Sequence, residues 1–508
     1  MKKSVLIFLL AVIPASTYAS IEEPIQLQAG QISGTLLDNG VQAFLGVPFA
    51  APPVGDLRWR PPQPVVPWSG IRKMDRKGPD CMQGRNTNLM SEDCLYLNVW
   101  TKAESSSDKL PVLVWIHGGG WRFKATYDGD AFAANGAVLV SVNYRMNAFG
   151  WMAHPALSEE SEHNVSGNYG VLDHLAALEW VQSNIEQFGG DKDNVTIFGE
   201  SAGGGSMYAL LATHAAEGLF HKVISESTWI NTSNVSNLKT HNGFMQSAEG
   251  MGASAISSML EELDLEEGSL LEKMRSLTAE QVMQLRVPVS LIVDGWLYDK
   301  PPIQTFYEGS QIKVPIMSGY NNGEGLGYVM RQQNLPKSVS EQRDLRAARL
   351  GDLSEELLEL YVAETNEDLL EVEIDYVSDD MFVRASRELA LAGLRANQDT
   401  FVYVFGRNSQ EPENLAPHYA EVKYVFNKLE DSASREDQDL ARLMNSYWVQ
   451  FARTGNPNQS GLPTWPAFDL ETQTHQFLDI NISQGSLDRK ERLDAMDSYL
   501  RARYGVTP

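Results

Sequence analysis

Cysteine is scarce in this sequence: its 508 residues contain two, Cys81 and Cys94. No histidine lies between them, and a metal site would need more ligands nearby, so that interpretation is weak. In an exported chain an even pair is most simply a disulfide. Closing a loop of this size contributes roughly 3 kcal/mol to stability.

Long apolar runs are also missing, because no segment approaches the roughly 20 apolar residues that span a bilayer. A short run from Val5 to Ile13 follows Met1-Lys2-Lys3 and precedes small residues that end at Ala19. This order is typical of a secretory signal peptide. We therefore predict that residues 1–19 are removed after Ala19, and that the mature protein is secreted or periplasmic, without a stable membrane anchor.

Basic residues are few: 41 Lys and Arg stand against 66 Asp and Glu, a formal charge of −25. Removal of residues 1–19 takes away Lys2 and Lys3 and leaves −27. Such a surface repels nucleic acid and favours solubility, so we expect no nucleic-acid partner. The oligomeric state does not follow from charge.

Continuous apolar runs indicate buried strands at 112–116, 137–143 and 195–198, and later at 314–318 and 400–405. Residues 172–188 have the apolar spacing of a helix. Before residue 80, Asp38-Asn39-Gly40 is a hairpin signal. Buried strands alternating with helices predict an α/β fold, with a central, mostly parallel sheet covered on both faces.

Two stretches, 230–300 and 330–395, are rich in Glu, Leu and Ala and contain no strong strand. We expect helical insertions there that cap one end of the sheet. No repeat, low-complexity tract or interdomain linker is visible. The mature chain, 20–508, is therefore predicted to form a single domain with a small N-terminal β region.

The strongest chemical signal is Gly199-Glu200-Ser201-Ala202-Gly203, directly after the predicted strand at 195–198. A G-x-S-x-G turn between a strand and a helix exposes its serine, and only glycine lets the backbone crowd there. Ser201 is the candidate nucleophile. A serine hydroxyl needs a base, and that base an acid, so the chain order should be Ser, then Asp or Glu, then His.

His418 is the best candidate base, because it follows the strand at 400–405 in a loop. The other histidines after Ser201 fit less well: His214 and His221 lie too close to it, His241 leaves little room for an acid-bearing strand, and His475 lies in a polar stretch that looks solvated. Glu324 is the candidate acid, since it lies between two glycines after the strand at 314–318. Asp294 and Asp299 compete with it, but they precede that strand.

His117-Gly118-Gly119-Gly120-Trp121 follows the strand at 112–116, as an HGGG oxyanion loop should. The amides of Gly119 and Gly120, with that of Ala202, are the predicted oxyanion donors. Losing one such donor typically costs about 10² to 10³ in rate.

Together these residues resemble the type-B carboxylesterases of the carboxylesterase–cholinesterase family, in particular its bacterial para-nitrobenzyl-esterase-like members. The resemblance covers nearly the whole mature chain. It rests also on segments far from the serine: Gly46-Val47-Pro48-Phe49-Ala50, Ser91-Glu92-Asp93-Cys94-Leu95-Tyr96-Leu97-Asn98, Asn143-Tyr144-Arg145, Ala416-Pro417-His418 with Glu421 behind it, and Phe451-Ala452-Arg453-Thr454-Gly455-Asn456-Pro457.

The resemblance implies one α/β-hydrolase domain, no cofactor or metal, a Cys81–Cys94 disulfide and the triad Ser201, Glu324 and His418. The expected activity is hydrolysis of small-molecule carboxylic esters through an acyl-enzyme. Other acyl substrates (lipase, amidase, carbamate or polyester hydrolase activity) and a non-catalytic adhesion ectodomain remain as alternatives.

Two departures from the family bear on the substrate. Choline-binding members carry a tryptophan inside the first disulfide loop, and residues 82–93 contain none, so cholinesterase specificity is set aside. Lys124 stands where glycine is usual, with Arg122 nearby. Trp121, Arg122 and Lys124 are therefore possible residues of the substrate mouth, where the two cations would favour anionic esters; the alternative is that both cations are merely solvated.

Overall fold

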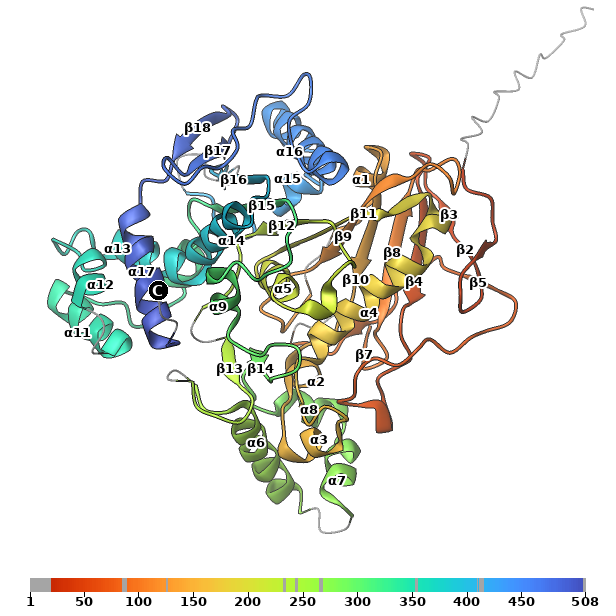
Figure 1. The fold of residues 1–508 in the computed structure, drawn as a ribbon, viewed down its shortest axis with the longest axis horizontal. Coiled ribbons are helices and arrows are strands. Elements are labelled where there is room, and N and C mark those ends of the chain that lie inside the picture. Colours follow the sequence, from red (N-terminus) through yellow and green to blue (C-terminus); the bar gives the residue numbers. More distant parts are fainter. Residues whose placement is uncertain are drawn as a thin grey trace, which may run out of the picture.

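The computed structural model describes residues 20–84, 89–124, 127–231, 234–242, 245–264, 268–351, 355–408, 410 and 415–505. The predicted signal peptide lies outside the described residues. Figure 1 shows a large twisted sheet at the centre, with helices in front of it and behind it, and a lobe of helices beside one edge.

The central sheet has eleven strands in the order β18-β17-β16-β15-β12-β11-β9-β10-β8-β4-β3. In this order, each pair of neighbouring strands between β17 and β10 is parallel, whereas the pairs toward both edges of the sheet are antiparallel. The strands are β3 (Thr35–Leu36), β4 (Gln42–Pro48), β8 (Tyr96–Thr101), β9 (Leu110–Ile116), β10 (Val138–Val142), β11 (Gly190–Glu200), β12 (Lys222–Glu226), β15 (Ile316–Asn321), β16 (Thr400–Phe405), β17 (Thr474–Leu478) and β18 (Ser483–Ser486).

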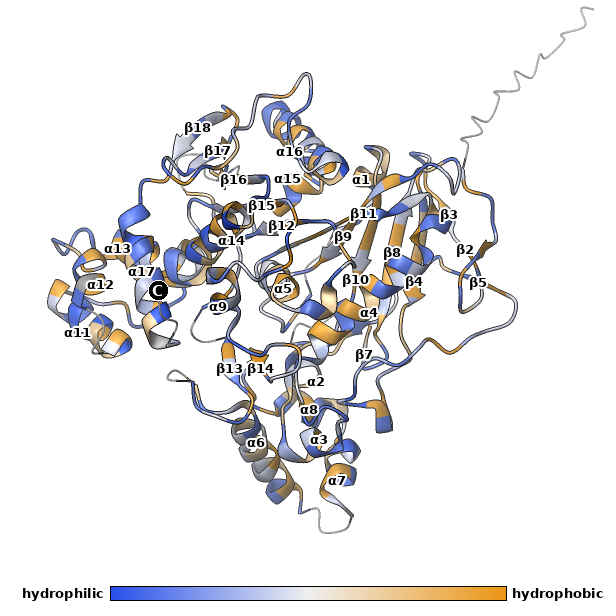
Figure 2. Cartoon of the chain, in the orientation of Figure 1, coloured by the Kyte–Doolittle hydropathy of each residue, from blue (hydrophilic) through white to orange (hydrophobic). Residues whose placement is uncertain are grey.

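Side chains alternate between the two faces of the sheet, and each face packs against different helices. Along β9, Val112, Val114 and Ile116 share a core with α4 (Tyr169–Asn184) and α5 (Ala202–Leu211). Leu113 and Trp115 point the other way and pack with α1 (Asp130–Ala134) and α16 (Arg435–Thr454). The central strands β9 and β10 are apolar along most of their length because both of their faces are covered, and Figure 2 shows hydrophobic residues concentrated in the central strands.

The segment between β12 and β15 is mainly helical: α6 (Ala248–Leu263), α7 (Leu270–Ser276), α8 (Ala279–Gln284) and α9 (Pro302–Tyr307). It also contains two short strands that we did not expect, β13 (Val235–Asn237) and β14 (Leu291–Val293), which pair in parallel. The side chain of Asn168 binds the backbone of β14, since it donates to the carbonyl of Ile292 at 2.8 Å and accepts from its amide at 3.0 Å. Three-residue strands are too short for an alternating pattern to reveal them.

A second helical segment lies between β15 and β16: α10 (Leu326–Val329), α11 (Val339–Leu350), α12 (Glu355–Leu360), α13 (Leu369–Ser378), the π-helical turn η5 (Asp379–Val383) and α14 (Arg384–Arg395). After β16 come α15 (Val422–Val425), α16 and, after β18, the last helix α17 (Lys490–Arg503). In Figure 1, α17 lies beside α13 and α14.

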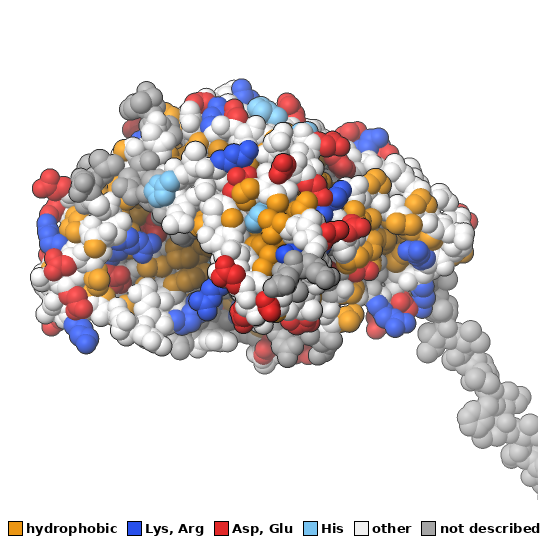
Figure 3. Space-filling view, turned by 90° about the horizontal axis from the view of Figure 1, so that it is seen from below, with side chains coloured by type: hydrophobic (Ala, Val, Ile, Leu, Met, Phe, Trp, Pro, Cys, Tyr) orange, Lys and Arg blue, Asp and Glu red, His pale blue; other side chains and the backbone are white. Residues whose placement is uncertain are grey.

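Smaller elements complete the N-terminal half: β1 (Ile25–Gln26), β2 (Gln31–Ser33), β5 (Ile71–Lys73), β6 (Asp80–Cys81), β7 (Met90–Ser91), α2 (Asn147–Trp151), α3 (Pro155–Glu160) and the 3₁₀ turns η1 (Gly55–Leu57), η2 (Ile185–Phe188) and η3 (His214–Ala216). A disulfide joins Cys81 to Cys94, as predicted. Within the described ranges, no helix has the length and hydropathy to cross a bilayer. Figure 3 shows acidic and basic side chains interspersed with hydrophobic ones on the face that carries α3, α6 and α7.

Candidate active site

Ser201 occupies a tight turn between β11 and α5. Its backbone has φ 59° and ψ −119°, a conformation that L-residues rarely adopt and that is found where a serine is exposed at such a turn. The two motif glycines are required by close approach. A Cβ would lie 2.5 Å from the carbonyl oxygen of Ile116 at Gly199, and 2.1 Å from it at Gly203. The carbonyl oxygen of Ile116, at the end of β9, thus lies close to both glycines of the turn.

The structure brings Ser201, His418 and Glu324 together from three separate parts of the chain. His418 Nε2 lies 2.9 Å from Ser201 Oγ, and His418 Nδ1 lies 2.5 Å from Glu324 Oε2. Ser201 is 6% exposed and Glu324 is fully buried. This continuous chain of contacts can move a proton from the hydroxyl to the imidazole while the carboxylate holds the ring.

Glu324 is oriented by the strand that precedes it. Its Oε1 accepts hydrogen bonds from the amide of Asn321 at 2.8 Å and from Ser227 Oγ at 2.5 Å. The competing Asp294 instead shapes its own loop, because its Oδ1 accepts hydrogen bonds from the amides of residues 296, 297 and 298. His475, which we expected to be solvated, lies partly buried in β17.

The glycine loop after β9 lies against the serine turn. A Cβ at Gly118 would come within 3.1 Å of Ser201 Cβ and 2.5 Å of the carbonyl oxygen of Glu200. Gly119 and Gly120 have φ values of 108° and 64°, and a Cβ at Gly119 would overlap the carbonyl of Phe123 at 1.9 Å. Ala202 is the first residue of α5, so its amide is at the helix N-terminus, where the first amides have no partner within the helix.

The three possible mouth residues have different environments. Trp121 is fully buried and donates from Nε1 to Ser206 Oγ at 3.1 Å, so it packs inside the protein. Lys124 is engaged: its Nζ lies 2.9 Å from Asp80 Oδ1, and its side chain is only 9% exposed. Its amide donates to Gln83 Oε1 at 2.7 Å, which ties this loop to the disulfide loop. Arg122 is exposed.

Three further buried carboxyl groups lie near the triad, and the sequence motifs assigned a role to none of them. Glu200 Oε1 lies 3.1 Å from His418 Nε2. Glu421 accepts from Asn321 Nδ2 at 2.6 Å, and its Oε1 lies 3.3 Å from Ser227 Oγ, which also contacts Glu324. Glu226 accepts from Trp448 Nε1 at 2.7 Å.

Burial and mutual repulsion favour the neutral form of these three groups. Burial raises the pKa of Glu200 well above its ordinary value, and the charges of Glu421, Glu324 and Glu226 add to this. Burial and the charge of Glu324 raise the pKa of Glu421 to about 7. Burial, then Glu421, raises the pKa of Glu226 in the same direction. Glu200 and Glu421 have a visible sequence signal, the first as the variable residue before the motif serine and the second as the glutamate behind the Ala416-Pro417-His418 segment, whereas Glu226 has none.

No group of three or more His, Cys, Asp or Glu side chains is placed to hold a metal ion in the described part of the chain. Among the described residues, both carboxyl oxygens of Glu200 and Oε2 of Glu226 make no hydrogen bond, and the raised pKa of these two groups favours their protonated state. A proton satisfies that chemistry better than a cation does.

Comparison with known proteins gives consistent matches over most of the chain. The model of the carboxylesterase family matches residues 22–498. A fumonisin B1 esterase of Sphingopyxis macrogoltabida is 35% identical over 472 residues, 89% of this chain and 85% of that protein. The human cocaine esterase is 32% identical, over 89% and 87% of the two chains.

Solved structures match over nearly their full length. A PNB esterase is 32% identical with a TM-score of 0.79, covering 93% of this chain and 99% of that one. A Geobacillus stearothermophilus carboxylesterase is 31% identical with a TM-score of 0.80 and the same coverage.

Proposed function

Because this chain belongs to the carboxylesterase family, has its α/β-hydrolase fold and is a carboxylic ester hydrolase, we propose that it is an exported enzyme that works through an acyl-enzyme on Ser201. The observation that carries the proposal is the line of contacts from Ser201 Oγ through His418 to Glu324, at 2.9 and 2.5 Å. Hydrogen-bonded nucleophile, base and orienting acid in this order are what serine hydrolysis requires.

In the acylation half, His418 Nε2 takes the proton of Ser201 Oγ as the oxygen attacks the ester carbonyl carbon. The bond to the alcohol oxygen then breaks, and the imidazolium returns the proton to the departing alkoxide. In the second half, His418 takes a proton from water, the resulting hydroxide attacks the acyl carbon, and the bond to Oγ breaks with return of the proton to the serine. Glu324 holds the ring and stabilises its positive charge in both halves.

The tetrahedral intermediates carry a negative oxygen, which needs donors fixed in advance. The amides of Gly119, Gly120 and Ala202 are the proposed donors. The contact of the neighbouring Gly118 with Ser201, the glycine backbone conformations at Gly119 and Gly120, and the position of Ala202 at the start of α5 support that role.

The class of substrate is carboxylic esters of small molecules. The names of the relatives specify different compounds, fumonisin B1 and cocaine, so esterases of this family act on different acyl and alcohol groups. A series of p-nitrophenyl esters of increasing acyl length measures the preference. We expect saturable hydrolysis by the wild type and loss of at least about 10³-fold in kcat for Ser201→Ala. Hydrolysis by Ser201→Ala at the wild-type rate would overturn the proposal.

Export is supported by the charged start, the apolar run and the small residues before Ser20, and by a disulfide, which persists in oxidising compartments. Expression of the full chain followed by intact-mass analysis of secreted and periplasmic protein tests it. The expected species begins at Ser20 and has no free thiol. Full-length protein confined to the cytoplasm would contradict export without touching the esterase mechanism.

A further inference from the structure

Two aromatic rings surround the imidazole of His418. The ring of Phe382 is stacked on it, with centroids 4.2 Å apart and planes at 28°. Tyr328 lies at 5.6 Å and 58°. Phe382 is fully buried, so its ring has no freedom to move away from the imidazole without disturbing its surroundings.

Phe382 lies in the π-helical turn η5, which interrupts a helix that otherwise runs from α13 into α14. A π-helical turn contains an extra residue and so changes the direction of the side chains that follow; such turns occur often at functional sites. Here the turn is the element that carries Phe382 to the imidazole.

The helix before the turn is joined to the loop that carries Glu324. Ser378 Oγ accepts a hydrogen bond from the amide of Gly325 at 2.8 Å and donates to the carbonyl of Ile374 at 2.7 Å. The packing is so close that a Cβ at Gly325 would lie 2.3 Å from the carbonyl oxygen of Ile374. The acid loop and the π-turn are therefore positioned together.

The C-terminal segment holds the turn from the other side. Asp379, the first residue of the turn, is fully buried; its Oδ1 lies 2.9 Å from Arg489 Nη1, and its Oδ2 accepts from Tyr361 at 2.7 Å. Arg489 directly precedes α17.

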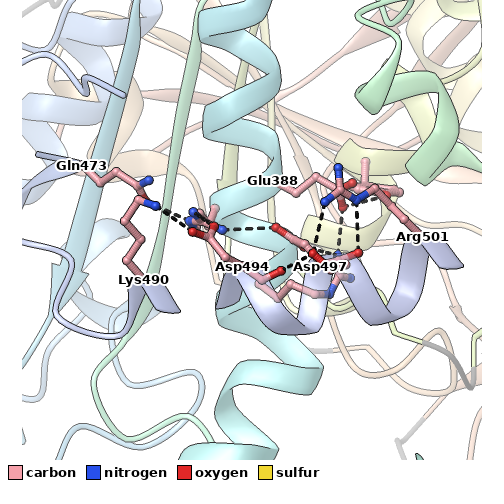
Figure 4. Close-up of polar contacts among 10 residues, drawn as sticks. Glu388, Gln473, Lys490, Asp494, Asp497 and Arg501 are labelled. Carbon is pink, nitrogen blue, oxygen red and sulfur yellow. Dashed lines mark hydrogen bonds and ion pairs between the residues drawn. The ribbon is translucent and has the colours of Figure 1, made fainter. Parts of the chain in front are cut away.

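The helix after the turn is tied to the same segment. Arg387 of α14 lies 2.5 Å from Asp494 and 3.1 Å from Asp497. Figure 4 shows these two aspartates on α17 facing α14, where Glu388 lies.

We propose that Phe382 is a positioning residue for His418, and that the Arg489–Asp379 pair holds the π-turn in the register that places it. The inference rests on the proposed role of His418 as the base. The imidazole must align with Ser201 and Glu324 at once, and such alignment has to be kept within about 10–20°. A flat ring stacked on one face limits rotation of the imidazole out of that line.

The test compares two substitutions of Phe382. Phe382→Leu removes the flat ring but keeps an apolar side chain, and Phe382→Tyr keeps the ring. We expect kcat on a p-nitrophenyl ester to fall about tenfold in Phe382→Leu, with KM within about twofold of wild type, because misalignment of the base affects chemistry more than binding. Phe382→Tyr should retain kcat to within about threefold. All rates are expressed per active site, counted by stoichiometric organophosphate labelling.

A matched pair of arginines tests the second half of the proposal. Arg489→Gln removes the arginine beside Asp379 and also its longer contact with Asp375 at 3.4 Å. Arg492→Gln removes the other arginine beside Asp375, whose Oδ2 lies 2.6 Å from Arg492 Nη1, and so controls for the loss of pairing at Asp375 alone. We expect Arg489→Gln to lower kcat several-fold at constant KM and Arg492→Gln to leave kcat unchanged. These two variants test the position of the π-turn even if Phe382→Leu does not fold.

Full kcat in Phe382→Leu or in Arg489→Gln would overturn the inference, as would an equal loss in Phe382→Tyr and Phe382→Leu. His418→Ala distinguishes a failure of this inference from a failure of the proposed mechanism. If it abolishes hydrolysis while the Phe382 variants keep full kcat, this inference fails and the proposed mechanism stands. If His418→Ala remains active, the mechanism itself fails.

Discussion

At the scale of single residues, the crowding of acids behind the triad sets the electrostatics of the site. Glu200, Glu226, Glu324 and Glu421 are all buried, and four negative charges in one apolar region would repel one another strongly. The pKa values of Glu200, Glu226 and Glu421 are all raised, whereas Glu324 receives two hydrogen-bond donors and the imidazole. Burial and mutual repulsion thus favour the neutral form of Glu200 and Glu226, and of Glu421 below about pH 7, whereas the hydrogen bonds to Glu324 orient its carboxyl group toward His418 Nδ1.

Glu421→Gln tests this distribution through stability. The pKa of Glu421 is about 7 in the folded protein and near 4.5 when unfolded, so the unfolded state loses its proton first and wild-type stability falls as pH rises from about 4.5 to 7. Glutamine does not titrate. We expect the Tm of Glu421→Gln, relative to wild type, to rise steadily between pH 4.5 and 7 and to level off above that. A Tm difference that is independent of pH would contradict the raised pKa.

Of the two cations predicted to favour anionic esters, Lys124 is already paired with Asp80. The prediction therefore now rests on Arg122, which is exposed. We expect Arg122→Glu to lower kcat/KM for an ester that carries a carboxylate by about threefold to tenfold relative to a neutral ester of the same size. Lys124→Gln should change both substrates alike. An unchanged ratio of the two rates in Arg122→Glu would remove charge selection from this loop.

Sequence reasoning found Ser201, Glu324 and His418 because each follows a recognisable strand, and loop position restricts the candidates. It assigned no role to Glu200, Glu226 or Glu421, because their importance comes from lying close together, and they are separated by up to about 220 positions in the chain. The partly buried ion pair of Lys124 and Asp80 was missed for the same reason, since Asp80 is 44 positions away.

At the scale of elements, the turn between β11 and α5 depends on the end of β9 as much as on its own sequence. Gly203→Ala would place a Cβ 2.1 Å from the carbonyl oxygen of Ile116. Backbone cannot give way there without displacing Ser201. We expect a loss of about 3 kcal/mol or more in the free energy of unfolding, with loss of activity in the protein that still folds.

Gly327→Ala is the matched control, because its Cβ would meet only the side chain of Arg331, at 3.6 Å. It lies in the short helix α10, so alanine should leave the free energy of unfolding unchanged or raise it by up to about 1 kcal/mol. Chemical denaturation of both variants measures the contrast. Equal stabilities would mean that close approach does not select the glycine at 203.

The strands at 112–116, 195–198 and 400–405 were predictable because continuous apolar runs are needed wherever both faces of a sheet are covered. The strand pair β13–β14 and the π-turn η5 could not be predicted in this way. The strands β13 and β14 are three residues each, and β14 is hydrogen-bonded by the distant side chain of Asn168. The π-turn η5 sits inside a stretch with ordinary helical spacing, and the contacts of Asp379 and Ser378 that accompany it involve distant parts of the chain.

At the scale of the whole molecule, buried histidines are expected to lower the free energy of unfolding as the pH falls below about 6.5. Burial lowers the pKa of His117 and of His174 to about 3. Both ring nitrogens of His174 have no hydrogen-bond partner among the described residues, and the ring packs against Tyr144 at 4.5 Å. In the unfolded chain these groups take up protons near pH 6.5, so folding stability falls as pH drops below that value and towards 3.

His174→Gln removes one of these two titrating groups. We expect the fall in Tm between pH 7 and pH 5 to be smaller in this variant than in wild type, whatever the constant offset caused by the new side chain. Thermal unfolding across that range is the measurement. A fall as steep as that of wild type would show that His174 does not couple folding to protons.

The central claim is that Ser201 forms the covalent intermediate, and mass spectrometry after reaction with a serine-directed organophosphate tests it most directly. Intact mass should show a single adduct per chain, and peptide mapping should place it on Ser201, with no labelling in Ser201→Ala and complete loss of hydrolysis in the labelled wild type. An adduct on another residue, or full hydrolysis by enzyme labelled at Ser201, would contradict the account.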